Sequence, residues 1–415
     1  MKKLIAFTSA ALAATAVFAA PVVSDVTMTQ DAGKTVNITY KLTGEPGIVT
    51  VDIQTNGPNG WVSIGGEHLT YFAGDANKVV QPTGENETRK ITWKPRKAWP
   101  DNEVTENVKA VLSAWSLDAP PDYMAISLTV PNTVLFYTDG AVPFGVENDM
   151  YKTDWMLMRK CPAANVAWRM GSPAKEEGRT AASEVPHLVA LTNDFYVGVY
   201  LVTQRQYFLM TGEKPSKYVD FEDSAMHPMQ GCTYEEIRGK AKDGYDWPKN
   251  NHEVIGTGFI GLLRKHSGLN ELDLPTDAQW EFACRAGCGA ALYNGKELAK
   301  GTATSDVNLE PLAHYGTKAT TTAKVGSYES NAWGIYDMYG NVWEFCLDWW
   351  LPDISAVDPE KGPLSNSENR RVVRGGRHGA SFAVSNFRSA RRDNAYSYNP
   401  SERYGFRLAC KAELK

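Results

Sequence analysis

The chain has 415 residues, of which 43% are hydrophobic, 22% charged and 11% aromatic, and its formal net charge is −5. This length predicts two or three domains, and the composition is that of an ordered globular protein, which excludes disordered and low-complexity architectures. The mildly acidic balance gives no basis for a nucleic-acid partner, because such binding depends on clustered Lys and Arg.

The N-terminus has the features of a secretory signal peptide. Lys2 and Lys3 precede an apolar run from Leu4 to Phe18, and small residues follow at Ala19 and Ala20. The run is shorter than the ~20 residues that span a bilayer, so a cleaved signal over residues 1–19 is favoured over a transmembrane anchor. We therefore expect an exported protein, periplasmic, surface-held or secreted, without a transmembrane segment after signal removal.

Residues 20–132 are predicted to form an all-β sandwich of immunoglobulin-like type. Apolar residues alternate with polar ones over residues 36–42, 49–53 and 124–130, which is the period of a half-buried strand. Clusters of turn-forming residues separate these runs, as at residues 44–47. No catalytic constellation stands out in this region, so we interpret it as a spacer or docking module.

A second domain is predicted over residues 158–415, after a linker over residues 133–157. Three helix starts are predicted there, because a Thr hydroxyl accepts from the N3 amide while Gln or Glu at N3 reaches back to the cap amide. The three pairs are Thr203 with Gln206, Thr233 with Glu236, and Thr276 with Gln279. One face of the third helix is expected to be buried, with the members Trp280, Ala283, Cys284 and Gly287.

The common catalytic motifs are absent from the sequence. It has no HExxH, P-loop or nucleophile elbow, and its cysteines show no CxxC spacing. Its seven histidines are scattered without metal-ligand spacing, so a histidine-based metal site is not expected.

Residues 334–345 carry two carboxylates, Asp337 and Glu344, around a turn that contains Gly340. Carboxylate and carbonyl oxygens at this spacing can converge on a hard cation such as Ca²⁺. The alternative is a tight turn in which Asp337 bonds nearby amides and an arginine neutralises Glu344.

Seven ordered motifs run through the second domain. They lie at residues 168–172, 195–207, 274–282, 340–345, 374–376, 388–391 and 405–407. Among them are Leu-Pro-Thr-Asp-Ala-Gln-Trp-Glu-Phe, Gly-Asn-Val-Trp-Glu-Phe and Gly-Phe-Arg. Together they resemble formylglycine-generating enzymes, the sulfatase-modifying-factor family, over about Met158 to Lys411.

The resemblance implies a low-regularity α+β domain related to C-type lectins. It also implies a structural calcium ion, with the ligands Asp337 (side chain), Gly340 and Val342 (carbonyls), and Glu344 (side chain). It further implies a disulfide between Cys284 and Cys410, which would join the third helix to the last strand; an oxidising compartment permits such a bond.

Oxidases of this family bind copper(I) through two cysteine thiolates that follow the Gly-Gly step. In this chain residues 377–387 contain no cysteine. The first thiolate position falls on Ala380 and the second on Val384 or Ser385, and none of these side chains can replace a thiolate on copper(I). Copper is therefore not expected, and no catalytic residue is assigned.

Two functions are weighed. The first is a non-catalytic binding or scaffold module, a pseudoenzyme that binds a protein, peptide or glycan. The alternative interpretation of its candidate binding surface is a solvated loop without a ligand. The candidate surface comprises Arg377, His378, Asn386, Arg388, Arg391, Asp393, Asn394, Tyr396 and Tyr398. The second function is a formylglycine-generating oxidase, or a related oxidoreductase with a rearranged active site.

Overall fold

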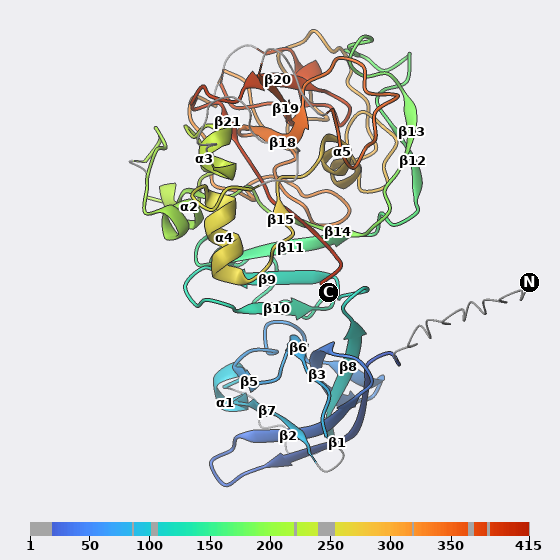
Figure 1. Ribbon diagram of the computed structural model, residues 1–415, viewed down its shortest axis with the longest axis vertical. Coiled ribbons are helices and arrows are strands. Elements are labelled where there is room, and N and C mark those ends of the chain that lie inside the picture. The colour runs from blue at the N-terminus through green and yellow to red at the C-terminus, as the bar shows by residue number, and fades with distance from the viewer. Residues whose placement is uncertain are drawn as a thin grey trace, which may run out of the picture.

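The computed structural model describes residues 19–84, 87–100, 107–219, 222–239, 254–317, 319–363, 369–379 and 382–414. The predicted signal residues 1–18 and the first thiolate position, Ala380, lie outside the described residues. The chain forms an N-terminal β-sandwich and a larger C-terminal domain, which lie end to end (Figure 1). Within the described ranges, no helix has the length and apolar character needed to cross a membrane.

The N-terminal sandwich consists of two antiparallel sheets. One has the strand order β1-β2-β7-β5, and the other has the order β4-β3-β6 with β8 on the far side of β3. Alternation along β2 places Val36, Ile38, Tyr40 and Leu42 in the buried layer. The elements are β1 (Val22–Gln30), β2 (Val36–Thr43), β3 (Gly47–Gly57), β4 (Gly60–Ser63), β5 (Phe72–Gly74), β6 (Lys78–Val80), β7 (Arg89–Trp93), α1 (Pro95–Ala98) and β8 (Val108–Ser116).

A six-stranded antiparallel sheet opens the C-terminal domain, in the order β10-β9-β11-β14-β22-β15. Its strands are β9 (Tyr123–Ser127), β10 (Val134–Tyr137), β11 (Trp155–Cys161), β14 (Phe195–Gly198), β15 (Leu272–Asp273) and β22 (Ala409–Lys411). Two expectations differ from this arrangement. The strand expected within residues 124–130 of the sandwich pairs instead with β11, and residues 133–157, expected as a linker, contain β10 and the start of β11.

The burial of β9 explains the first difference. All five of its residues are buried, so the strand is covered on both faces, whereas a sandwich strand with one solvated face would alternate. The hydrophobic residues alone do not show whether the strand is buried on both faces or on one.

The remainder of the domain combines short strands and helices. It contains the pairs β12-β13 and β16-β17 and a four-stranded sheet in the order β20-β19-β18-β21. The strands are β12 (Ala167–Met170), β13 (His187–Ala190), β16 (Ala313–His314), β17 (Tyr339–Gly340), β18 (Trp343–Trp349), β19 (Arg370–Arg374), β20 (Asp393–Tyr396) and β21 (Tyr404–Gly405). The helices are α2 (Gln204–Thr211), α3 (Tyr234–Arg238), α4 (Phe259–Ser267), α5 (Asp277–Arg285) and the short 3-10 turns η1 (Asp149–Lys152), η2 (Ser224–Met226) and η3 (Val384–Phe387).

The three predicted helix starts are confirmed. Thr203, Thr233 and Thr276 each cap a helix, and each forms a complete capping box with the residue three positions on. In α5 the face with Trp280 and Cys284 is buried as expected, but Gly287 lies beyond the helix end and is exposed.

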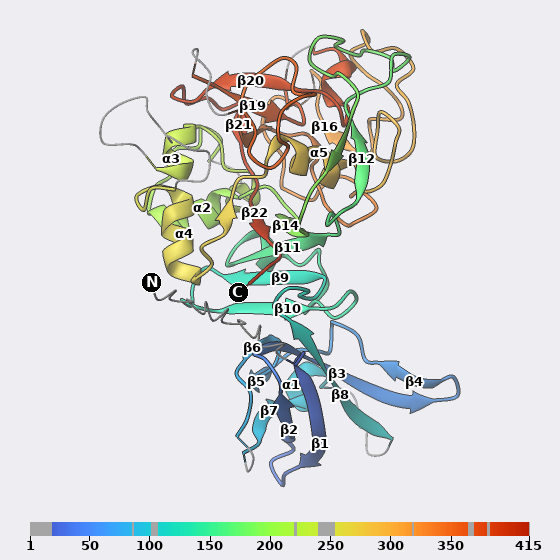
Figure 2. The same ribbon diagram turned by 45° about the vertical axis from the view of Figure 1, so that its right-hand side comes forward.

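The two parts of the molecule share buried contacts. Ile48 of β3 is fully buried in the same hydrophobic cluster as Met124, Ile126 and Phe136 of the C-terminal domain. The four-stranded sheet with β20 lies at the end of the molecule away from the sandwich, as two views show (Figures 1 and 2).

Candidate functional site

The arginines of the sequence motifs lie in the protein interior. Arg374 in β19 is fully buried; its Nε donates to Asp277 Oδ1 at 2.5 Å and its terminal nitrogen to Glu281 Oε2 at 3.0 Å. Both carboxylates lie on α5, one turn apart. Burial opposes the charge on Asp277, but the Arg374 and Arg392 guanidinium groups hold the pKa of Asp277 below its usual range. These ion pairs fasten α5 to β19.

Arg388 forms a second buried cluster. Its guanidinium donates to Glu176 Oε1 at 2.5 Å and to both oxygens of Glu184 at 2.8 Å. Arg388 has no exposed surface, so the expectation that it belongs to a ligand surface is wrong. The pKa of Glu176 is raised because burial outweighs the Arg388 charge. Sequence reasoning missed both glutamates, which precede Arg388 by about 200 residues and carry no local signal of this pairing.

Glu344, a predicted calcium ligand, is paired with an arginine. Arg407 donates from Nε to Glu344 Oε2 at 2.6 Å and from a terminal nitrogen to Oε1 at 2.9 Å, and the Trp280 indole donates to Oε2 at 3.0 Å. Asp337 Oδ2 accepts from the Gly326 amide at 2.7 Å, and burial raises the pKa of Asp337 to about 6.

These contacts do not fit the implied calcium site. Both oxygens of Glu344 are occupied by a guanidinium, so the positive charge that a cation would bring is already supplied. In the part of the chain that the structure describes, no group of three or more His, Cys, Asp or Glu side chains is arranged to hold a metal. The geometry matches the alternative, a tight turn with an arginine-neutralised Glu344.

Three further residues of the predicted ligand surface are held within the loop after β19. His378 is 2% exposed; its Nδ1 lies 2.6 Å from the Asn341 carbonyl oxygen, and burial lowers its pKa to about 4. Arg377 donates to the His378 carbonyl at 2.8 Å, and Asn386 donates to the Ala383 carbonyl at 2.9 Å. His378 is therefore an interior residue, and the other two side chains bond their own loop.

The remaining predicted residues lie along β20. Arg391 and Asp393 form an ion pair at 2.8 Å, with side chains 20% and 37% exposed. Beyond it, four residues form what we call the β20 patch: Arg370, Asn394, Tyr396 and Tyr398.

The β20 patch is held in place by cross-strand contacts. Arg370 donates to Asn394 Oδ1 at 2.7 Å and to the Tyr396 hydroxyl at 2.9 Å, and its guanidinium lies 4.6 Å from the Tyr396 ring centroid. The Tyr396 and Tyr398 rings are 5.4 Å apart, and Tyr398 is 41% exposed. Arg370 was missed from sequence, because only the register of β19 against β20 places it opposite Tyr396.

The predicted Cys284–Cys410 disulfide does not form in this structure, where all six cysteines are free thiols. Cys284 and Cys410 belong to different hydrophobic clusters. Cys284 lies 3.7 Å from the Ser389 hydroxyl, whereas Cys410 lies in β22 between Tyr196 and Leu272 of the neighbouring strands. Burial raises the pKa of each thiol to about 12, so both are protonated at neutral pH.

Comparison with known families gives a match to the sulfatase-modifying factor enzyme 1-like domain over residues 164–412, which is more than half of the chain. The chain belongs to this family. The region matched includes the buried arginine clusters and the β20 patch but leaves out the sandwich, β9 and β10.

Relatives in this family carry different names. The chain is 32% identical over 206 residues to serine/threonine-protein kinase pkn1 of Chlamydia pneumoniae, covering 46% of this chain and 29% of that protein. It is 34% identical over 148 residues to a formylglycine-generating enzyme of Streptomyces coelicolor, covering 34% and 47%. The chain thus spans less than half of either relative. Among solved structures, PvdO from Pseudomonas aeruginosa aligns with a TM-score of 0.49 at 21% identity, covering 61% of this chain and 94% of that one.

The resemblance implies a second thiolate at residue 384 or 385, and the two residues differ in burial here. Val384 is fully buried in η3. The Ser385 amide donates to the Gly301 carbonyl at 3.1 Å, and its carbonyl accepts from Arg388 Nε at 3.0 Å. A Cβ added at Gly178 would lie 2.4 Å from the Ser385 Cβ, so only glycine fits against this residue. Val384 therefore lies in the interior, and the Gly178 backbone packs against the half-buried Ser385.

Proposed function

We propose that this protein is an exported, non-catalytic member of the sulfatase-modifying factor enzyme 1-like family and acts as a binding or scaffold module. The observation that carries the proposal lies at residues 384 and 385, where a fully buried Val and a half-buried Ser, which packs against Gly178, stand in place of the second thiolate. A copper(I) site of the oxidase type needs soft thiolates that reach a substrate, and neither residue supplies one.

The β20 patch supports a binding role. It presents aromatic rings, an amide and a guanidinium whose positions are fixed by hydrogen bonds within the patch. Rigid aromatic and adaptable polar groups of this kind suit a glycan or a polar peptide. The patch lies at the end of the molecule away from the sandwich, which suits a spacer that holds the binding face outward (Figure 2).

The oxidase alternative draws its support from relatives named formylglycine-generating enzyme. It requires that two other cysteines act as the thiolate pair. Burial raises the pKa values of Cys161, Cys232, Cys284, Cys346 and Cys410, which opposes thiolate formation. We therefore rank this alternative second.

The proposal is tested with a glycan array and a random peptide library, each probed with the purified mature chain. Tyr398→Ala is expected to lower binding of any selected ligand at least about fivefold, since a stacked aromatic contributes ~1 kcal/mol. The matched control is Trp61→Ala, which removes a similarly exposed aromatic (42%) from the sandwich. Failure of both probes to yield a ligand that distinguishes these variants would contradict the proposal.

A further inference from the structure

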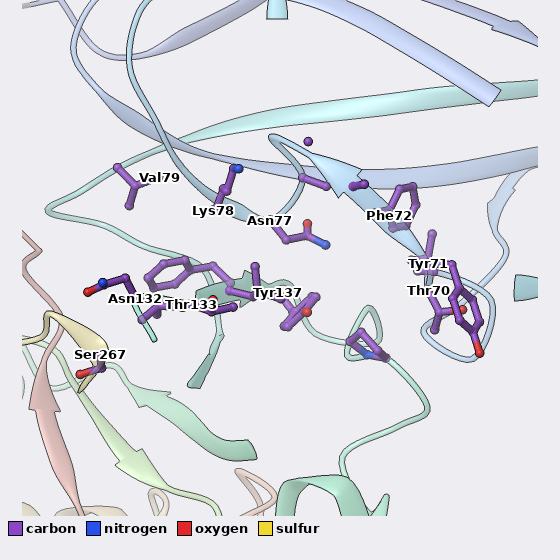
Figure 3. Close-up of a pocket in the computed structure, with 18 of the residues that line it drawn as sticks. Thr70, Tyr71, Phe72, Asn77, Lys78, Val79, Asn132, Thr133, Tyr137 and Ser267 are labelled. Carbon is purple, nitrogen blue, oxygen red and sulfur yellow. The ribbon is translucent and has the colours of Figure 1, made fainter. Parts of the chain in front are cut away.

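A cleft of about 700 Å³ lies between the sandwich and the six-stranded sheet (Figure 3). One wall comes from residues 69–79, which include β5 and the start of β6, and the other comes chiefly from residues 132–137, which include β10. Both walls lie outside the region matched by the family, so the cleft is distinct from the β20 patch. Its volume is within the range of ligand-binding sites in proteins.

The wall formed by β10 is a sheet edge whose backbone is open at Val134. β10 is the terminal strand of its sheet and pairs with β9 alone. The Ser127 amide donates to the Thr133 carbonyl, so antiparallel alternation turns the N–H and C=O groups of Val134 and Phe136 away from β9. The Phe136 amide donates to the Asn77 carbonyl at 2.7 Å, whereas no described residue bonds the backbone of Val134 on that side.

The opposite wall carries edges as well. β5 and β6 are the terminal strands of the two sandwich sheets, and residues of both line the cleft. Unpaired backbone groups along an edge form a template for a further strand. The bond between Phe136 and Asn77 joins the two walls at one point, and the edge at Val134 stays open beside it.

Two aromatic residues with unusual backbone also line the cleft. Tyr71 has φ +58° and is 51% exposed, and Phe144 has φ +59° and is 44% exposed. They are the only aromatic residues with positive φ in the described ranges. Such a backbone costs a bulky residue ~1 to 3 kcal/mol and is retained mainly at functional sites. An exposed aromatic gains little from the protein core, so the strain favours a role in binding.

The polar groups that line the cleft indicate which kind of ligand it can bind. Thr70 is 5% exposed, and no described residue bonds its hydroxyl. The lining contains one charged side chain, Lys78, whose Nζ is paired with Asp75 Oδ1 at 3.5 Å, and no Asp or Glu. A buried hydroxyl without a partner is available to a ligand, and a lining whose one lysine is already paired favours an uncharged ligand.

We infer that this cleft binds an extended peptide strand of another protein by adding it to the edge of β10. The added strand accepts from the Val134 N–H and donates to the Val134 carbonyl. Its alternate apolar side chains pack between Phe144 and the aromatic side chains of Tyr71 and Phe72. The backbone bonds give affinity with little sequence dependence, and the aromatic groups select apolar side chains.

The inference is tested by selecting a random seven-residue peptide library on the full mature chain and measuring Kd for the selected peptides. Val134→Pro removes the outward N–H without breaking the ladder to β9, a position at which edge strands tolerate proline. It is expected to weaken binding about tenfold, since one net backbone hydrogen bond is lost. Val134→Ala keeps the N–H and is the matched control, with an expected change within about twofold.

Phe144→Ala gives a second readout that does not depend on proline being tolerated, with an expected loss of about fivefold. Tyr398→Ala is expected to leave these peptides bound, which separates the cleft from the β20 patch. Enrichment of alternating apolar peptides that respond to Val134→Pro and Phe144→Ala supports the inference. No enrichment overturns it, and so do peptides that bind the Val134→Pro or Phe144→Ala variant as tightly as the wild-type chain.

Discussion

Single residues show most directly how the motifs of this family act in this chain. The motif arginines Arg374, Arg388 and Arg407 are fully buried, and each is paired with carboxylates from other segments. Removing one partner of such a pair leaves an uncompensated charge in the interior. These three motif arginines therefore stabilise the packing of the domain.

Arg388→Met is expected to lower the free energy of unfolding by about 3 to 5 kcal/mol, because it leaves Glu176 and Glu184 buried without their cation. Arg391→Met is the matched control: its ion pair with Asp393 is partly exposed, and the expected loss is below about 1 kcal/mol. Urea unfolding of the two variants measures both values. An equal loss of unfolding free energy in the two variants would contradict the buried ion pairing of Arg388 with Glu176 and Glu184.

Asp348 gives the fold a pH dependence. Burial, together with the charge of Asp277, raises the pKa of Asp348 to about 7. The folded chain then binds more protons than the unfolded chain between about pH 4 and pH 7, so this residue's contribution to stability falls as the pH rises through that window.

Asp348→Asn removes this titration while keeping an oxygen that can accept from the Asp277 amide. The free energy of unfolding of the variant, relative to the wild-type chain, is expected to rise between pH 4 and pH 7. His378, whose pKa is lowered to about 4, contributes the opposite slope to both proteins and cancels in the difference. Unfolding at a series of pH values measures the difference, and a flat result would contradict the expectation.

The segment around Glu344 shows what sequence can and cannot predict about single residues. The spacing of Asp337, Gly340 and Glu344 allowed a calcium turn or an arginine-neutralised turn, and no local feature decides between them. The deciding residue, Arg407, lies 63 positions further on and reaches Glu344 because β18 and β21 run side by side. Contacts of this range depend on the fold as a whole.

At the scale of secondary-structure elements, local chemistry predicted helix starts well. The three capping boxes were predicted from Thr with Gln or Glu three positions on, because both hydrogen bonds form within one turn. A strand within residues 124–130 was also predicted, and β9 covers residues 123–127, but its sheet was not predicted, because the hydrophobic pattern does not specify a pairing partner.

Thr276→Ala tests the contribution of the cap of α5. It removes the side-chain bond to the Gln279 amide and is expected to lower the free energy of unfolding by about 1 kcal/mol. Thr276→Ser keeps the hydroxyl and should retain most of that stability. Chemical unfolding compares the two, and an equal loss in both variants would show that packing of the methyl group, and not the cap, is what Thr276 supplies.

At the scale of the whole molecule, arginine–carboxylate pairs stabilise the C-terminal domain, and one of them, Arg407 with Glu344, stands where the family resemblance implied calcium. Excess Ca²⁺ is therefore expected to leave the unfolding midpoint within about 1 °C of its value in chelator, whereas a ligand at 100 times its Kd would add about 2.7 kcal/mol. A rise of several degrees in the unfolding midpoint would contradict the conclusion that Arg407 takes the place of a calcium ion at Glu344. As a control, Glu344→Gln should destabilise the chain equally with and without Ca²⁺.

The molecule also has a feature, the cleft between the sandwich and the C-terminal domain, that no single sequence motif predicts. The family motifs predicted the C-terminal domain, and period-two patterning predicted the sandwich. The cleft between them, with the edge of β10 and the aromatic residues Tyr71 and Phe144, arises only from the way in which the two parts pack (Figure 3).

The most direct test of the non-catalytic proposal is a titration of the mature protein with copper(I) under reducing conditions, in competition with a chelator. The same sample is assayed for oxidation of a cysteine-containing peptide of the sulfatase type. Because Val384 and Ser385 supply no thiolate and the pKa values of Cys284 and Cys410 are raised to about 12, we expect neither stoichiometric binding nor peptide oxidation. Tight stoichiometric binding together with oxidation of the peptide would contradict the proposal and place the thiolate pair on other cysteines.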